Sequence, residues 1–324
     1  MTVLRWGILG ASNFAATQMA PAIHVAKGAE LLALGTSHPE KAKRFLDFAP
    51  SIRVYETYED VLGDSDIDAV YIPLPNHLHV EWSLKALAAG KHVLCEKPMT
   101  MHASEFDRLV AARNESGKLA AEAFMIVHHP QFVRAKALLE AGALGRVRHV
   151  EAVFSYFNDD VGNIRNQACV GGGGLPDIGV YTFGAARYLT GEEPLSIPYA
   201  HIDFDGGVDV FSQIAARFPS FTYSAVVSMR LAKRQEVVLH GEEGLLRLTC
   251  PFNAAVHDQA ELVIETTGNA RTTERFPGVN HYINQVEAFG RAAHTGEAFA
   301  CPLEFSKGTQ QMMDMAFAAA RNDG

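Results

Sequence analysis

The stretch GILGASNFA, residues 7–15, passes from a strand through a tight turn into a helix, and it decides the fold of the first part of the chain. The apolar run Leu4–Leu9 predicts a buried strand. After the turn, apolar residues recur at the spacing of one helical face, which predicts a helix over residues 14–26. A strand, a turn and a helix in this order are typical of the start of a parallel α/β sheet.

The turn places Gly10, Ser12 and Ala15 at the three positions of a G-x-G-x-x-G/A loop. Free backbone N–H groups at the start of such a helix can hold a pyrophosphate, so the loop predicts dinucleotide binding, with Asn13 and Phe14 among the contacting residues. Ser12 departs from the glycine usual at the second position, where the backbone must approach the phosphate closely. A serine still fits there and can donate a hydrogen bond.

The alternation of short apolar strands with helical segments continues through the first third of the chain. This order predicts an α/β fold that begins with a Rossmann-type, doubly wound parallel sheet. We expect the further strands at residues 30–36, 53–55, 68–72, 93–95 and 119–124, and the further helices at residues 39–48, 78–89 and 103–116.

The residues after the second strand bear on the choice of dinucleotide. An NAD-specific loop usually carries an acid there, which binds the ribose hydroxyls. This chain instead has GTSH at residues 35–38, with Lys41 and Arg44 shortly after. Because Ser37, His38 and Lys41 could bind a 2′-phosphate, we expect NADP as the cofactor, with NAD as the alternative. An ordinary basic helix start remains the other interpretation of these residues.

The fourth strand is followed by IPLPNHLH, residues 72–79. Prolines stop the strand, because a proline cannot continue a central ladder. Pro75, Asn76 and His79 are then expected to shape the nicotinamide side of the cofactor site. The alternatives are that Asn76 only caps the following helix and that His79 is a surface histidine.

The fifth strand ends in HVLCEKP, residues 92–98, where Pro98 stops the ladder. Glu96 and Lys97 therefore stand at the carboxyl end of a strand, where open α/β sheets bind their ligands. From these residues alone, Lys97 is either half of a surface ion pair or a group that takes part in chemistry. Glu96 is expected to anchor either Lys97 or the cofactor loop.

After about residue 145 the pattern changes to successive strands separated by turns such as residues 205–207. It predicts an α+β domain with a large, mostly antiparallel open sheet. We expect a first domain over residues 1–123 and a second over residues 124–324, with the last helix as a candidate to pack back on the first domain. The strands are expected at residues 147–157, 201–205, 210–218, 223–229, 236–240, 245–249 and 262–265, and the helices at residues 177–188, 282–293 and 303–320.

Composition excludes several classes of protein. The formal net charge of -9 argues against affinity for nucleic acid or anionic membranes. No apolar run approaches the ~18 residues that span a bilayer, and the amino terminus runs directly into a strand instead of a signal peptide. The four cysteines, at positions 95, 169, 250 and 301, show neither a disulfide framework nor a metal-site spacing. We therefore expect a cytoplasmic protein without nucleic-acid, membrane or metal partners.

Four segments together resemble the Gfo/Idh/MocA family of oxidoreductases. They are the glycine loop, PNHLH at residues 75–79, AGKHVLCEKP at residues 89–98 and GGGGLPDIGVY at residues 171–181. Their order and spacing hold along the whole chain, and the combination of EKP with D-I-G-x-Y is specific. The resemblance implies a Rossmann domain followed by a substrate-binding and dimerisation domain, and a homodimer or homotetramer formed through the open sheet.

The resemblance also assigns roles to individual residues. Lys97 corresponds to the lysine placed between nicotinamide and substrate, and Asp177 and Tyr181 fall at the functional positions of the D-x-x-x-[H/Y] segment. Their spacing of four supports this, because a helix would place both on one face. We expect the glycine run 171–174 to leave room for a ligand. A capping aspartate with a packed tyrosine is the simpler alternative. Arg165 stands where family members carry an arginine, to bind substrate hydroxyls or to hold the loop.

The mechanism that we infer is oxidation of a secondary or anomeric carbinol by hydride transfer to the nicotinamide. A free tyrosine, with a pKa near ~10, is a poor base at neutral pH. The ammonium of Lys97 would favour the tyrosinate form of Tyr181. Tyr181 is then the general base, Lys97 also binds the substrate oxygen, and Asp177 orients the substrate hydroxyl or Lys97.

One segment departs from the family pattern. EAFMIVHHPQF, residues 122–132, has Ile126 and Val127 where many sugar-oxidising relatives have Tyr-Arg, which removes polar contacts. The two histidines that follow either compensate or only flank the proline. We expect a sugar or polyol substrate, with aldose (pyranose) to aldonolactone chemistry as the leading interpretation. The alternatives are a trans-dihydrodiol dehydrogenase, a ketosugar reductase and a non-catalytic NADP-binding sensor.

Overall fold

The computed structural model describes residues 3–254, 256 and 258–322, and the chain divides into two compact units. The first unit comprises Met1–His128 and His281–Lys307, and the second comprises His129–Asn280 and Gly308–Gly324. This division differs from the expected one, in which residues 1–123 and 124–324 form separate domains, because a late segment of the chain returns to the first unit.

Helix α8 (His281–Thr295) makes that return because its apolar face is buried within the first unit. The ring of Phe289 lies 5.2 Å from that of Trp6, and the ring of Tyr282 lies 5.6 Å from that of Phe14, centroid to centroid. Of the last helix, α9 (Leu303–Asn322), only the start up to Lys307 belongs to the first unit. The expected return of the last helix to the first domain is therefore made mainly by α8.

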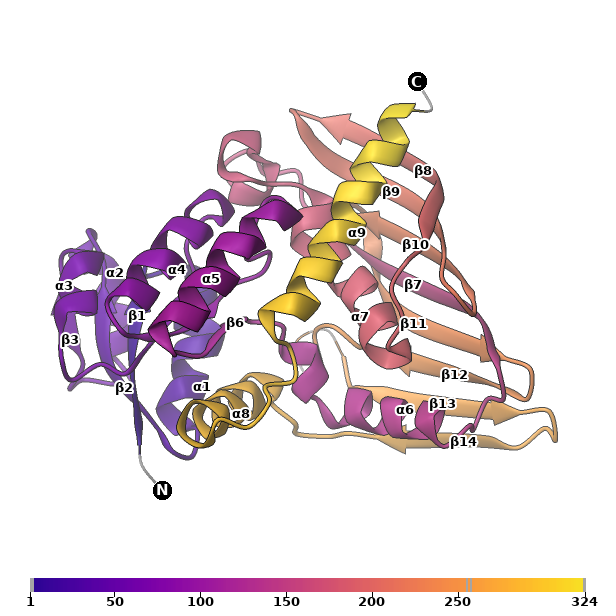
Figure 1. Cartoon of the computed structure of the whole chain (residues 1–324), viewed down its shortest axis with the longest axis horizontal. Helices are drawn as coiled ribbons and strands as arrows, with labels where there is room; N and C mark the ends of the chain where they lie inside the picture. Colours follow the sequence, from indigo (N-terminus) through magenta and orange to yellow (C-terminus); the bar gives the residue numbers. More distant parts are fainter. Residues whose placement is uncertain (1–2, 255, 257, 323–324) are drawn as a thin grey trace. The chain divides into compact units, whose positions relative to one another are not determined.

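The first unit contains a six-stranded sheet in the order β3-β2-β1-β4-β5-β6, and all neighbouring strands are parallel (Figure 1). This confirms the Rossmann-type sheet. Because the strands are parallel, their carboxyl ends meet at one edge, and the loops that carry the expected site residues start there. The strands are β1 (Leu4–Leu9), β2 (Ala29–Gly35), β3 (Arg53–Tyr55), β4 (Ala69–Ile72), β5 (His92–Cys95) and β6 (Ala120–Glu122).

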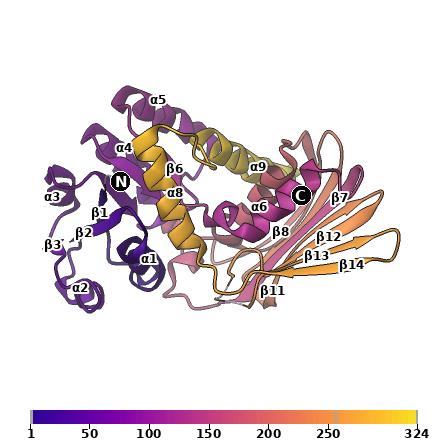
Figure 2. The same cartoon turned by 90° about the horizontal axis from the view of Figure 1, so that it is seen from below.

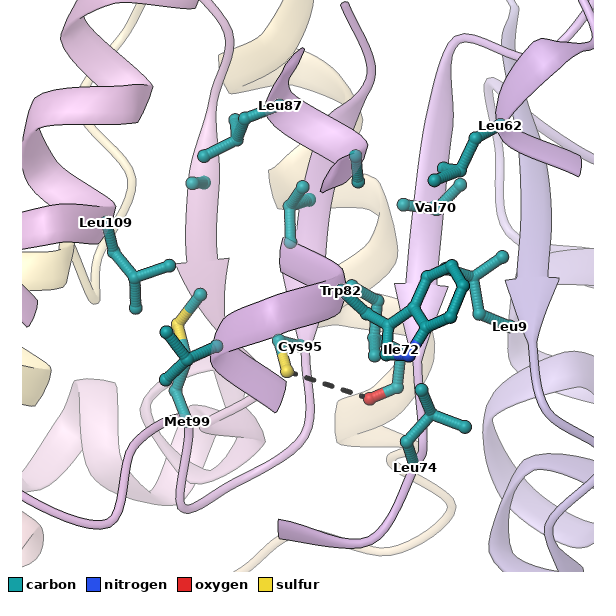
Figure 3. Close-up of a cluster of buried hydrophobic side chains, with 14 of the residues drawn as sticks. Leu9, Leu62, Val70, Ile72, Leu74, Trp82, Leu87, Cys95, Met99 and Leu109 are labelled. Atoms are coloured by element: carbon teal, nitrogen blue, oxygen red, sulfur yellow. Dashed lines mark hydrogen bonds between the residues drawn. The ribbon is translucent and has the colours of Figure 1, made fainter. Parts of the chain in front are cut away.

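Helices pack on both faces of this sheet, as the alternation along β1 requires. Trp6 points to the face covered by α8, whereas Leu9 belongs to a buried cluster with Leu87 of α4 and Leu109 of α5 (Figure 3). Full burial of one such side chain contributes ~1.5–3 kcal/mol to folding. The helices are α1 (Ala20–Val25, preceded by a π-helical turn, Ala15–Met19), α2 (Pro39–Leu46), α3 (Tyr58–Gly63), α4 (His79–Ala88) and α5 (Phe106–Ser116). Of these, α3 was not expected from the sequence.

The second unit contains an eight-stranded sheet in the order β14-β13-β12-β11-β7-β10-β9-β8 (Figure 2). Only β7 and β10 pair in parallel, so the expected large, mostly antiparallel sheet is confirmed. The strands are β7 (Val147–Phe157), β8 (Ser196–Asp205), β9 (Val208–Arg217), β10 (Thr222–Ser228), β11 (Arg230–Gly241), β12 (Gly244–Thr249), β13 (Glu261–Thr266) and β14 (Arg271–Arg275).

Helices α6 (Pro130–Glu140) and α7 (Val180–Thr190) lie on one face of this sheet (Figure 1). Helix α6 and strand β14 were not predicted from the sequence. The start of α6 had a readable signal, because Pro130 occupies its first turn and the His129 ring accepts a hydrogen bond from the Gln131 N–H at 3.0 Å. Within the described ranges of the chain, no helix combines the length and the apolar character that a membrane crossing requires.

Candidate active site

The glycine loop has the backbone that a dinucleotide site requires. Gly10 has a φ of +111°, a conformation that favours glycine, and a Cβ at this position would lie 2.9 Å from Leu74 Cδ2. The chain can therefore make the tight turn after β1 only with glycine. The turn leads directly into the helical segment that begins at Asn13, whose first N–H groups are the expected phosphate donors.

Ser12 takes a second role in this loop that the sequence did not reveal. Its Oγ accepts a hydrogen bond from the Ala15 N–H at 3.0 Å, and its carbonyl accepts one from the Ala16 N–H at 3.1 Å. The side chain thus caps the helix, while its own hydroxyl hydrogen can still donate to a ligand. The ring of Phe14 is engaged with Tyr282, so Phe14 would meet a phosphate through its backbone N–H.

The end of β2 presents exposed polar residues, as the NADP interpretation requires. Ser37, His38 and Lys41 are all exposed. His38 Nδ1 lies 3.3 Å from Glu40 Oε1, a carboxylate contact that the sequence did not reveal and that competes with a phosphate for the His38 ring. Arg44 donates a hydrogen bond to Asn13 Oδ1 at 2.7 Å and so links this region to the glycine loop. These residues fit a 2′-phosphate, with Lys41 as the main cation.

We expect Lys41→Ala to raise the KM for NADP about tenfold, because it removes one charged partner of the phosphate in a solvent-exposed setting. The KM for NAD, which lacks that phosphate, is expected to stay within about twofold of wild type. Lys43→Ala is the matched control, because Lys43 is exposed on the same helix and is paired with Asp47 at 2.7 Å. Initial rates with each cofactor check this, and an equal loss with both cofactors would contradict it.

The segment after β4 is held together by a buried histidine. His79 is fully buried, with Nδ1 2.8 Å from the Pro98 carbonyl and Nε2 2.7 Å from the Leu74 carbonyl. Burial lowers the pKa of His79 to about 4, although both carbonyls favour the charged ring. His79 is therefore neither a surface histidine nor a side chain that faces the cofactor directly; it joins the loops after β4 and β5.

Pro75 and Asn76 lie at the start of a short 3-10 turn (Asn76–Leu78) just before α4. The residue directly before the turn is Pro75, and the residue directly before α4 is Leu78. Neither makes a side-chain capping hydrogen bond. Asn76 is therefore not the N-cap that the sequence suggested, and its place in the loop after β4 stays a prediction of cofactor contact.

The backbone of the loop that carries Lys97 is held by three side chains, one from the loop itself, one from α4 and one from β6. The Lys97 N–H donates to Glu96 Oε2 at 3.3 Å, the Pro98 carbonyl contacts His79 as described, and the Met99 N–H donates to Glu122 Oε1 at 2.8 Å. Glu122 is 3% exposed, and burial raises its pKa, while the Met99 N–H and the charge of Lys97 oppose that rise. The backbone around Lys97 is thus held in place before any ligand binds.

Glu96, whose role the sequence left open, is anchored from β4. The hydroxyl of Tyr71 donates to Glu96 Oε1 at 2.6 Å, and Tyr71 is fully buried. Burial, followed by the negative charge of Glu96, raises the pKa of Tyr71 well above its usual value, so this hydroxyl stays a donor. The Tyr71 hydroxyl and the Lys97 N–H hold the two carboxylate oxygens of Glu96. Within this unit Glu96 therefore serves as part of the support of Lys97.

In the second unit, Asp177 is the centre of a small polar cluster. Its side chain is 12% exposed, and its Oδ2 accepts a hydrogen bond from the Tyr156 hydroxyl at 2.7 Å and an ion pair from Arg165 Nε at 2.9 Å. The negative charge of Asp177 raises the pKa of the Arg165 guanidinium. Arg165 thus contacts Asp177. Tyr156 also belongs to this site, although it was not predicted from the sequence. The sequence signal that could have indicated Tyr156 is an inward position on the predicted strand 147–157.

Tyr181 stands one helical turn after Asp177 and is surrounded by aromatic rings. Its ring centroid lies 5.9 Å from that of Phe154 and 5.8 Å from that of Phe252, and the residue is 6% exposed. The segment Leu175–Gly179, which contains Asp177, is a π-helical turn that continues into α7. π-helical turns of this kind often occur at functional sites.

The glycine run before this helix is filled by protein. Gly173 has a φ of +137°, and a Cβ there would lie 2.2 Å from Asp209 Oδ1. Asp209 is 3% exposed and accepts a hydrogen bond from the Leu175 N–H at 2.6 Å, while burial raises its pKa to about 6. The expectation that residues 171–174 leave room for a ligand is thus corrected at Gly173, because the space beside it holds the carboxylate that caps the start of the helix.

The departure at Ile126 and Val127 also has a structural explanation. Both side chains are buried, at 0% and 2% exposed, in the 3-10 turn Met125–His128 of the first unit. The His128 ring packs 5.0 Å from that of Phe299, and burial lowers the pKa of His128 to about 4. Ile126, Val127 and the His128 ring pack inside the unit, so His128 does not compensate for the lost polar contacts. His129 does not compensate for them either, because its ring caps α6.

The first unit thus brings the glycine loop, the end of β2 and the Lys97 loop to one edge of its sheet, and the second brings Asp177, Arg165 and Tyr181 to the start of α7. Metal ligands were not expected, and among the described residues no three His, Cys, Asp or Glu side chains are grouped to hold an ion. A dinucleotide loop with a supported lysine, together with a carboxylate and tyrosine on one helix start, defines a nicotinamide-dependent oxidoreductase.

The chain belongs to the Gfo/Idh/MocA oxidoreductase family. The model for the oxidoreductase family with an NAD-binding Rossmann fold matches residues 4–124, and the model for the GFO/IDH/MocA C-terminal domain matches residues 132–247. The resemblance seen in the sequence is confirmed, and the protein is an NAD(P)-dependent oxidoreductase.

Three similar proteins illustrate the range of this family. An uncharacterized oxidoreductase of Rhizobium meliloti is 35% identical over 97% of this chain and 96% of its own length. A D-xylose 1-dehydrogenase (NADP(+)) of Haloferax volcanii is 32% identical over 98% of this chain and 97% of its own. The crystal structure of a 3-ketoreductase from Actinomadura kijaniata with NADP and TDP-benzene has a TM-score of 0.89 and 31% identity, and 98% of each chain is covered.

Proposed function

We propose that this protein is an NADP-dependent sugar dehydrogenase that oxidises the anomeric carbinol of an aldopyranose to an aldonolactone. The observation that carries the proposal is the cluster around Asp177. Its carboxylate is mostly buried, accepts from two donors and lies one helical turn from Tyr181. This arrangement suits Asp177 to binding a neutral hydroxyl group and Tyr181 to deprotonating it.

The choice of NADP rests on the exposed Ser37, His38 and Lys41 after β2, where no carboxylate follows the strand directly. It is supported by the NADP named for the Haloferax dehydrogenase and for the Actinomadura ketoreductase complex. Gly10, Ser12, Asn13 and Phe14 would hold the pyrophosphate, and Pro75, Asn76 and Glu96 would shape the nicotinamide end.

In the proposed reaction, a bound nicotinamide supplies the hydride acceptor at C4. Tyr181 takes the hydroxyl proton at its Oη, and the carbon–oxygen bond becomes a carbonyl as the hydride leaves carbon. Lys97 binds the same substrate oxygen and stabilises the negative charge that develops on it. Asp177 accepts a hydrogen bond from a neighbouring hydroxyl and so orients the sugar. In reverse, Tyr181 returns the proton to the carbonyl oxygen.

The charges near Asp177 favour a neutral sugar over a sugar phosphate or nucleotide sugar. A diphosphate needs cationic partners, but Arg165 is paired with Asp177 at 2.9 Å and Arg230 with Asp205 at 3.1 Å. An uncharged polyol requires no further cation in this unit.

Reduction of a 3-ketosugar is the second candidate, and it is favoured by the likeness to the Actinomadura ketoreductase. It uses the same three residues, with Tyr181 as the acid. A trans-dihydrodiol dehydrogenase would use them too, so only substrates can separate these activities.

A substrate screen tests the proposal. The protein is incubated with NADP or NAD and a panel of aldoses, inositols and vicinal diols, and with NADPH and 3-ketosugars, while the absorbance of the reduced nicotinamide is followed. We expect turnover of aldopyranoses with NADP and a lactone product that hydroxylamine traps. Turnover of ketosugars alone would establish the second candidate. Tight NADP binding without any turnover would refute the proposed dehydrogenase activity and favour a non-catalytic NADP-binding sensor.

We also propose a homodimer or homotetramer formed through the face of the second sheet opposite α6 and α7, where polar side chains such as His149 and Glu151 lie partly exposed. A cytoplasmic location is proposed as well. It is supported by the sequence, in which the four cysteines, at positions 95, 169, 250 and 301, show no disulfide framework. Light scattering of the purified protein checks the assembly.

A further inference from the structure

Tyr156, on β7, makes a contact that core packing does not explain. Its ring packs against Val208, Val210 and Met229, and a phenylalanine would do this equally well. Its hydroxyl, however, donates to Asp177 Oδ2 at 2.7 Å. A buried hydroxyl without a partner is unfavourable, so the tyrosine at this position is matched to the carboxylate.

The contact is charge-assisted and shared with Arg165. Tyr156 and Arg165 reach the same oxygen, at 2.7 Å and 2.9 Å. Two donors on one carboxylate oxygen restrict rotation about the side-chain bonds of Asp177 and favour its charged form. Burial, followed by the charge of Asp177, raises the pKa of Tyr156 above its usual value, so Tyr156 stays protonated and serves as a donor, never as a base.

The same strand also supports Tyr181. Phe154, two residues before Tyr156 and therefore on the same face of β7, lies 5.9 Å from the Tyr181 ring. Phe154 in turn stacks on Phe252, with centroids 5.0 Å apart and planes 17° apart. Alternate residues of one strand thus reach both functional side chains of the helix start.

We propose that Tyr156 is a positioning residue that acts through Asp177, holding its carboxylate charged and in one orientation for the substrate hydroxyl, while Phe154 holds the ring of Tyr181. This inference rests on the proposed function, because it takes Asp177 to be the group that orients the sugar. It adds a residue to the site that lies on a strand, outside the D-x-x-x-[H/Y] segment.

The test is Tyr156→Phe in the full-length protein with NADP and the best sugar of the screen. We expect kcat to fall about tenfold and the KM for sugar to rise, because the Asp177 carboxylate loses one of its two donors. The KM for NADP is expected to be unchanged. Tyr199→Phe is the matched control, because Tyr199 is an exposed tyrosine on β8 of the same sheet.

A double-mutant cycle with Asp177→Ala separates positioning from packing. If Tyr156 acts through Asp177, Tyr156→Phe has no further effect on kcat in the Asp177→Ala background. Equal losses in both backgrounds, or wild-type kcat for Tyr156→Phe alone, would overturn the proposal.

The two proposals fail in different ways. If the wild-type protein turns over no sugar, the proposed function is lost, and the urea midpoints of the same four proteins still report on the contact. We then expect Tyr156→Phe to lower the midpoint in the wild-type background and to leave it unchanged or raise it beside Asp177→Ala. Identical shifts in both backgrounds would remove the Tyr156–Asp177 contact and the inference with it.

Discussion

Lys97→Ala is expected to lower kcat/KM for the sugar by about 10³-fold while NADP still binds. The ammonium is proposed to stabilise the oxygen that gains negative charge, and removal of one such group typically reduces the rate ~10²–10³-fold, with loss of its effect on the proton transfer in addition. The fold is expected to persist, because the loop is held by its backbone contacts to His79, Glu96 and Glu122, none of which needs the lysine side chain.

Three measurements check this first prediction. Steady-state kinetics report the loss, fluorescence titration reports NADP binding, and thermal unfolding reports the fold. Lys97→Met is the matched variant, since it keeps the apolar stem and removes only the charge. Tyr181→Phe is a second arm that preserves the ring contacts with Phe154 and Phe252 and is expected to lose a similar factor. Activity within threefold of wild type in either arm would refute the assigned role.

Acid is expected to destabilise the protein strongly between pH 6.5 and 4, because several buried or half-buried histidines must gain protons on unfolding. Burial lowers the pKa values of His79, His92, His128 and His129 to about 4. In the unfolded chain their pKa returns to the ordinary value near ~6.5. A lowered pKa means that the stability of the neutral ring is fully present above pH 6.5 and is lost as the pH falls to 4.

The size of the effect follows from proton linkage. Each fully buried histidine changes the free energy of unfolding by up to about 1.4 kcal/mol per pH unit in this window. Asp209 and Glu122 act in the opposite direction, because burial raises the pKa of both carboxyl groups, to about 6 for Asp209, and their neutral forms favour the folded state as the pH falls. The four histidines outnumber them, so a net loss of several kcal/mol is expected.

Urea unfolding at a series of pH values measures this slope. His79→Gln is expected to be less stable at pH 7 but to show a shallower fall between pH 6.5 and 4, since one titrating ring is removed. His38→Gln, at an exposed position, serves as the control and is expected to keep the wild-type slope. If His79→Gln kept the full slope, the ring would already be charged in the folded protein, as its two carbonyl neighbours would favour.

Local patterns along the sequence were enough to predict the features that depend only on neighbouring residues. The apolar run Leu4–Leu9 and the loop from Gly10 predicted the strand, the turn and the Rossmann-type sheet, because strand propensity, glycine conformation and helix spacing are local properties. The spacing of Asp177 and Tyr181 likewise placed them one turn apart. Helix α3 was missed because it is only a short turn, capped by Thr57.

Residues whose partners are distant in sequence could not be judged in this way. His79 has the same local pattern whether it is exposed or buried, and only its contacts with the Leu74 and Pro98 carbonyls show its role. The glycine run 171–174 suggested room for a ligand, but Asp209, more than thirty residues later, occupies the space beside Gly173. Residues 281–307 belong to the first unit because their side chains pack against it, and no local pattern in the sequence predicts this packing.

The sequence by itself therefore determined the family, the order of the two sheets and the residues Lys97, Asp177 and Tyr181 as the proposed chemical groups. It did so because these depend on short motifs and their spacing. Only the tertiary structure decided what supports them: Tyr71 and Glu122 around the Lys97 loop, and Tyr156 and Arg165 on Asp177. Burial and contacts between segments set the charge and the orientation of a side chain, and neither can be read from its neighbours along the chain.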